Sequence, residues 1–69
     1  MKKLSHQIIA LSGPDHLVKR LVELGFVESE ILMIQSKLPF GGPYVVALKN
    51  AQFALREEEL QCLQLKPMA

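Results

Sequence analysis

The chain has 69 residues, a formal net charge of +1 and a hydrophobic content of 49%. We expect one domain over residues 1–69, and a domain of this size buries only about 60% of the surface of its unfolded chain. The near-neutral charge argues against nucleic-acid binding, and no apolar stretch approaches the roughly 18 residues that insert across a bilayer.

The first part of the chain predicts a strand followed by a helix. Ser5–Leu11 is an apolar strand without alternation, so its inward face is ambiguous. Ser12-Gly13-Pro14-Asp15 is typical of a helix start, with a capping-type Ser, an early Pro and an acid near the positive end of the helix dipole. Gly25 is typical of a helix end, where φ > 0 is common. The helix extends to about Leu24, and its apolar stripe consists of Leu17, Val18, Leu21 and Leu24.

Two apolar runs around a tight bend predict a β-hairpin. Ile31–Ile34 leads into the bend at Leu38–Pro43, and Tyr44–Leu48 leads out of it. Pro restricts φ and the paired glycines Gly41 and Gly42 allow φ > 0, as a tight turn requires. Because side chains alternate across a strand, runs without alternation place apolar groups on both faces of the hairpin.

The last third of the chain predicts short elements. Lys49-Asn50 ends the second hairpin strand, and Asn50 tolerates the left-handed backbone that a tight turn needs. Ala51–Leu55 predicts a fourth strand, Arg56–Glu59 a single helical turn, and Leu63–Leu65 a last strand. The expected fold class is mainly β: a small, partly open barrel of five short strands, with one α-helix between strands 1 and 2.

Three segments resemble a known family. They are Leu21–Phe26, Leu38–Pro43, and Phe53–Arg56 followed by acidic residues, in that order and at family spacing. Together they resemble the ferrous iron transport protein A (FeoA) family, although Phe40 and Gly42 replace the more usual Leu and Asp at the hairpin tip. The resemblance implies an SH3-like barrel in the bacterial cytoplasm. It also implies protein–protein contact with a membrane ferrous iron transporter that carries a GTP-binding domain.

The resemblance therefore implies a small accessory or regulatory protein of bacterial ferrous iron uptake. The same fold forms the last domain of metal-dependent repressors, so a metal-sensing SH3-like domain is the alternative. The family's link to iron places no ligand on this sequence, because no family His or Cys motif is carried onto it.

The hairpin strands also predict a partner-binding surface. If alternate residues such as Leu32 and Val46 face the core, four apolar side chains face outward together, and Phe40 lies at the hairpin tip. The predicted partner-binding residues are Ile31, Met33, Val45, Ala47 and Phe40. We expect them to serve a homo-oligomer or docking onto the transporter. The alternatives are that the chain's own termini cover the outward residues and that Phe40 folds back over Tyr44.

Catalytic and metal-binding signals are weak in this sequence. There is no nucleophile–base motif and no phosphate-binding loop, so we expect no enzyme and no cofactor. His6, His16 and Cys62 are the only soft metal ligands, and their spacing does not fit a zinc site. A single cysteine excludes an internal disulfide, and the run Ile8–Leu11 is too short for a signal peptide, so the expected location is the cytoplasm.

Overall fold

The computed structural model describes residues 4–68. Its elements are β1 (Leu4–Leu11), α1 (Asp15–Leu24), β2 (Ile31–Lys37), β3 (Tyr44–Leu48), β4 (Ala51–Leu55), α2 (Glu57–Leu60) and β5 (Leu63–Pro67). Their order is the order expected from the sequence. The hairpin strand β2 continues to Lys37, beyond the apolar run that ends at Ile34.

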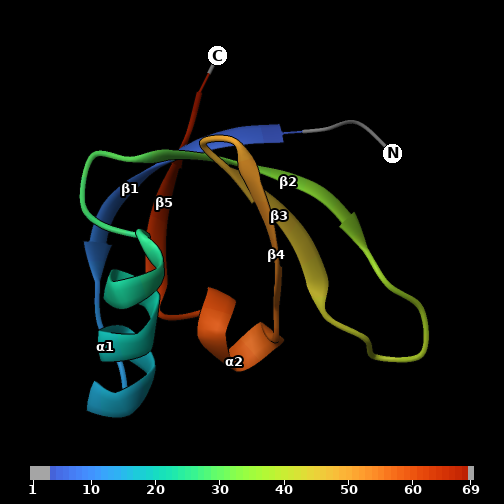
Figure 1. Cartoon of the computed structure of the whole chain (residues 1–69), viewed down its shortest axis with the longest axis horizontal. Helices are drawn as coiled ribbons and strands as arrows, with labels where there is room; N and C mark the ends of the chain where they lie inside the picture. Colours follow the sequence, from blue (N-terminus) through green and yellow to red (C-terminus); the bar gives the residue numbers. More distant parts are fainter. Residues whose placement is uncertain (1–3, 69) are drawn as a thin grey trace.

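The five strands form one antiparallel sheet in the order β4-β3-β2-β1-β5. Figure 1 shows a strongly curved sheet, with β1 and β5 on one side, β3 and β4 on the other, and both helices at the lower end of the view. The edge strands β4 and β5 do not pair with each other, so the barrel is open. This confirms the expected fold class, with α1 between the first two strands.

Two irregularities bend the strands of this sheet. The register of β1 with β5 shifts between Ile8 and Ala10, and the register of β2 with β3 shifts between Ile34 and Ser36. An extra residue in one strand bends that strand and increases its twist. The unmatched residues are Ile9 and Gln35, and the bends allow five short strands to curve around a single core.

The helix α1 begins and ends as its end signals predict, with two corrections. Asp15 lies in the first turn, and Gly25 ends the helix with φ 107°. Ser12 does not cap the helix; Pro14 holds the N-cap position, and the Ser12 Oγ accepts a hydrogen bond from Gln64 Nε2 at 2.9 Å. The predicted stripe is also wrong at its end, because Leu24 is 37% exposed, whereas the other members pack into the core.

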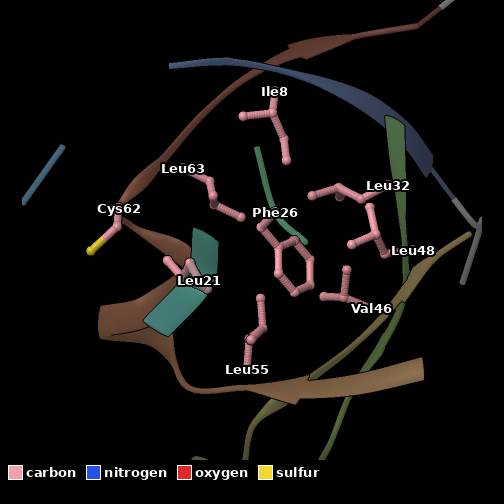
Figure 2. Close-up of a cluster of buried hydrophobic side chains, with 9 residues drawn as sticks. All are labelled: Ile8, Leu21, Phe26, Leu32, Val46, Leu48, Leu55, Cys62 and Leu63. Carbon is pink, nitrogen blue, oxygen red and sulfur yellow. The ribbon is translucent and has the colours of Figure 1, made fainter. Parts of the chain in front are cut away.

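Phe26 lies at the centre of the hydrophobic core, as Figure 2 shows. The Phe26 N–H donates a hydrogen bond to the Leu21 carbonyl at 2.9 Å, which turns the chain inward directly after α1. Its ring meets the Phe53 ring edge-on, with 5.2 Å between centroids. Edge-to-face pairs of this kind are favourable. The buried core residues are Ile8, Leu21, Phe26, Leu32, Val46, Leu48, Leu55, Cys62 and Leu63.

The turns use residues other than those expected from the sequence. At the hairpin tip, φ is positive at Phe40 (61°) and Gly41 (71°) but not at Gly42. Gly42 is needed for space instead, because a Cβ there would lie 2.9 Å from the Leu38 Cβ. In the turn between β3 and β4, Lys49 rather than Asn50 adopts the left-handed conformation, with φ 56°.

Candidate partner-binding surface

Alternation along β2 and β3 separates two apolar sets of side chains. Leu32, Val46 and Leu48 are buried in the core. Their neighbours therefore point to the opposite side of the sheet, which we call the outer face. The outward apolar residues on these two strands are Ile31, Met33, Val45 and Ala47, and we call this set the outer strip.

The structure brings the members of the outer strip together on neighbouring strands. Met33 lies directly opposite Ala47 in the register of β2 with β3, and Val45 lies opposite Ser36. Ile31, at the beginning of β2, is 49% exposed, whereas the other three members are half-buried. The strip is thus narrow, and it is most open to solvent at Ile31.

Uncharged polar side chains border the outer strip. Ser5 lies opposite Met33 and Gln7 opposite Ile31, both on β1. From β4, opposite Ala47, Gln52 Nε2 donates a hydrogen bond of 2.7 Å to Gln35 Oε1 on β2, so this pair reaches over β3. Strands with one solvated face commonly alternate inward apolar with outward polar residues, so the outward apolar residues of β2 and β3 differ from the usual pattern.

The predicted covering of the strip by the chain's own termini is only partly within the described residues. Residues 1–3 and 69 lie outside the described residues, so covering of the strip by these residues stays a prediction. Residues 4–68 leave Ile31 half exposed.

Phe40 lies beyond the outer strip, at the tip of the hairpin that projects from the body of the molecule in Figure 1. This residue is 104% exposed, so its side chain packs against nothing within residues 4–68. The alternative that Phe40 folds back over Tyr44 is wrong, because Phe40 is fully exposed. The Lys37 Nζ instead lies 5.5 Å from the centre of the Tyr44 ring. Leu38 is also exposed, so the hairpin tip carries two accessible apolar side chains.

A second part of the outer face was not predicted from the sequence. Ile9, unmatched at the bulge of β1, is exposed and borders an open depression of about 280 Å³. The residues lining this depression are Gln7, Ile8, Ile9, Glu28, Ser29 and Lys66. The lack of alternation in Ile8–Leu11 was the only sequence signal for it, and that signal left the direction of each side chain undetermined.

The possible metal ligands lie apart in the fold. Cys62 is buried, and its Sγ–H donates to the Glu58 carbonyl at 3.4 Å. His16 is exposed on α1, whereas His6 lies on β1 with a buried Nδ1 that has no hydrogen-bond partner within residues 4–68. Among these residues, no group of three His, Cys, Asp or Glu side chains is placed to hold an ion.

The helices and ion pairs add little to this surface. Arg20 Nε lies 3.4 Å from Glu59 Oε2, and Lys49 Nζ lies 3.6 Å from Glu30 Oε1; neither ion pair includes a member of the outer strip. No helix within the described part of the chain combines the length and the apolar character needed to cross a bilayer.

Comparisons with known proteins agree with this architecture. Residues 5–67 match the FeoA domain family. The FeoA-like protein from Clostridium acetobutylicum has the same fold, with a TM-score of 0.88 over 97% of this chain and 78% of that chain, at 19% identity. No protein in a search of curated sequences matches the chain.

Two more similar sequences have solved structures. FeoA from Stenotrophomonas maltophilia, solved with zinc, has a TM-score of 0.77 and 30% identity over 91% of this chain and 79% of that chain. It is described as a procaryotic SH3 domain protein and put forward as an activating factor for bacterial ferrous iron transport. Iron(II) transport protein A from Clostridium thermocellum has a TM-score of 0.79 and 30% identity over 93% of this chain, which spans only 40% of that protein.

The open five-stranded barrel and these superpositions define a small SH3-like protein of mainly β structure. Because the family match covers nearly all of the sequence, the chain belongs to the FeoA family, which is associated with ferrous iron transport.

Proposed function

We propose that this chain is a small cytoplasmic accessory protein of bacterial ferrous iron uptake. It acts by protein–protein contact with the membrane transporter that carries the GTP-binding domain, and it has no catalytic chemistry of its own. Family membership supports the pathway, and the relative from Stenotrophomonas maltophilia, put forward as an activating factor, supports a regulatory role.

The outer strip and Phe40 form the docking surface in this proposal. Covering about 200 Å² of apolar surface at ~25 cal/mol per Å² contributes about 5 kcal/mol before the costs of association. Phe40 adds an exposed aromatic side chain of the kind that fills a partner's pocket at the centre of an interface.

The observation that carries the proposal is the uncharged outer strip, with Met33 and Ala47 paired at its centre. Docking gives these outward apolar side chains a partner, which the described part of the chain does not supply to Ile31.

A pull-down from bacterial membranes tests the proposal. The double variant Met33→Glu/Val45→Glu places two charges in the outer strip and should reduce capture of the transporter at least tenfold. Val22→Glu is the matched control, because it adds an acid at an exposed apolar residue on α1. Circular dichroism checks that both variants remain folded. Equal capture by the wild type, the double variant and the control would refute docking through the strip.

A metal-sensing SH3-like domain is the second candidate function. Two observations favour it: the relative from Stenotrophomonas maltophilia was solved with zinc, and the His6 Nδ1 is buried without a hydrogen-bond partner in the described residues. Calorimetric titration with Fe(II) and with Zn(II) tests this function, with His6→Ala as the comparison. If neither Fe(II) nor Zn(II) binds the wild type, this candidate function is excluded.

A further inference from the structure

The strand β4 leaves one of its edges open. Within residues 4–68, its only backbone partner is β3, and β4 is a terminal strand of the sheet. The sequence Ala-Gln-Phe-Ala-Leu contains no charge, no Pro and no Gly, and its register with β3 has no bulge. Natural proteins place charges, Pro or bulges in edge strands to stop them from pairing with other chains, and β4 has none of these. The other terminal strand, β5, carries a charge at Lys66 and a proline at Pro67.

The register of β3 with β4 shows which backbone groups are available on the open edge. The pair Leu48–Ala51 closes the two-residue turn Lys49–Asn50. We infer that this pair is hydrogen-bonded, as the pair closing a two-residue hairpin turn normally is. Hydrogen-bonded and non-hydrogen-bonded pairs alternate along an antiparallel ladder. The N–H and C=O groups of Gln52 and Ala54 therefore point away from β3, and no described strand pairs with them.

We propose that β4 pairs with β4 of a second copy of this chain, antiparallel and around a two-fold axis at Phe53. In this register Gln52 of each copy lies opposite Ala54 of the other, and the exposed edge groups form about four backbone hydrogen bonds. The two sheets become one continuous sheet, with both cores on the same side. Moving the axis to Gln52 or Ala54 leaves part of each strand unpaired, so the axis at Phe53 uses the strand best.

The absence of like charges facing each other in this register favours a second copy as the occupant. With the axis at Phe53, Arg56 lies opposite the uncharged Asn50 of the other copy, just beyond the paired strands. Like charges directly opposite each other destabilise paired strands. The strand itself has no charges and Arg56 meets no like charge, so two copies of this edge pair without charge repulsion.

Phe53 provides an apolar contact at the axis. Its side chain is half-buried and already meets the Phe26 ring in the core. Residues at a non-hydrogen-bonded antiparallel pair have Cα atoms only about 4.5 Å apart, and aromatic pairs there are favourable. The two Phe53 side chains would thus extend the edge of each core across the interface.

This inference goes beyond the proposed function, because it concerns the strand edge and requires neither the transporter nor iron. The pairing also places Gln52 of one copy beside Ala54 of the other on the outer face. The outer strips of the two copies then lie on one continuous surface. Self-association would then leave each outer strip free for a different partner.

Sedimentation velocity of the full chain between about 10 µM and 1 mM tests the pairing. An interface of one strand pair is small, so we expect a dimer that dissociates in the upper part of this range. Gln52→Lys/Ala54→Lys adds the charges that protect natural edges, and it should weaken the dimer at least tenfold. The control Gln61→Lys, at an exposed residue of the chain after α2, should dimerise like the wild type. A wild-type monomer at 1 mM, or equal dimerisation of all three proteins, overturns the inference.

Disulfide trapping tests the register. Oxidation of a mixture of the Gln52→Cys and Ala54→Cys variants should give a cross-linked heterodimer, because these residues lie opposite each other. Each variant alone should give at most a tenth of that yield. Cross-linking of Gln52→Cys with itself, or no cross-link in the mixture, contradicts an axis at Phe53. The membrane pull-down is a separate readout, so failure here and failure of the proposed function are distinguishable.

Discussion

Phe40 combines a strained backbone with a side chain that stabilises nothing within residues 4–68. Its φ of 61° lies in the left-handed region, and its ring is fully exposed. The left-handed conformation costs an L-residue about 1–2 kcal/mol. An exposed ring returns none of this through burial. We therefore predict that replacing Phe40 raises the stability of the isolated protein when the new residue relieves the strain.

Two substitutions separate the ring from the backbone. Phe40→Ala removes the ring and keeps the strain, so the free energy of unfolding should change by less than about 0.5 kcal/mol. Phe40→Gly relieves about 1.5 kcal/mol of strain, while its more flexible unfolded chain offsets about 0.7 kcal/mol. The net gain of about 0.8 kcal/mol should raise the unfolding midpoint by roughly 3–6 °C for a domain of this size.

Thermal unfolding followed by far-UV circular dichroism, together with urea unfolding, measures both variants. If Phe40→Ala lowers the free energy of unfolding by more than about 1 kcal/mol, the ring packs against the protein and the reasoning is wrong. If Phe40→Gly is no more stable than Phe40→Ala, the backbone strain is absent. Weaker capture of the transporter by a more stable Phe40→Gly protein would agree with an aromatic anchor kept for binding.

The remaining predictions concern stability and are read by urea unfolding. Phe26→Ala should cost about 3–5 kcal/mol, because it empties the centre of the core; a loss below 1 kcal/mol would contradict that placement. Gly42→Ala should cost about 1 kcal/mol or more, because its Cβ would meet Leu38, and an unchanged midpoint would show that the turn relaxes freely. Glu59→Ala should cost about 1 kcal/mol, because the Glu59 carboxylate accepts a hydrogen bond from the backbone N–H at the start of α2. Arg20→Ala removes the ion pair to Glu59 from its exposed Arg20 side and should cost less than about 0.5 kcal/mol; equal losses would assign the effect to that pair.

The elements of the fold could be predicted because their signals are local. Gly25 ends α1 and the Pro-Gly bend separates β2 from β3, since both act through the backbone of a few neighbouring residues. The division of β2 and β3 into inner and outer residues followed from the two-residue period of a strand. The outer strip was therefore visible in the sequence, although its role as a docking surface stays a proposal.

The errors arose where a residue's surroundings decide its role. Leu24 continues the spacing of the helical stripe, yet it lies at the end of α1, where it is left exposed. Ser12 has the chemistry of a helix cap, but its hydroxyl is engaged by Gln64, which is distant in sequence. Lys49 takes the left-handed position that Asn50 would tolerate better, so the hairpin's geometry overrides the local preference.

Local periodicity and turn chemistry alone determined the order of the strands along the chain, the single helix after the first strand and the apolar outer residues of the hairpin. Only the tertiary structure decided the spatial strand order β4-β3-β2-β1-β5, the outward direction of Ile9 at its bulge and the position of β4 at an open edge. Those features depend on contacts between residues far apart in the sequence. The period of a single strand carries no information about which strand lies beside it.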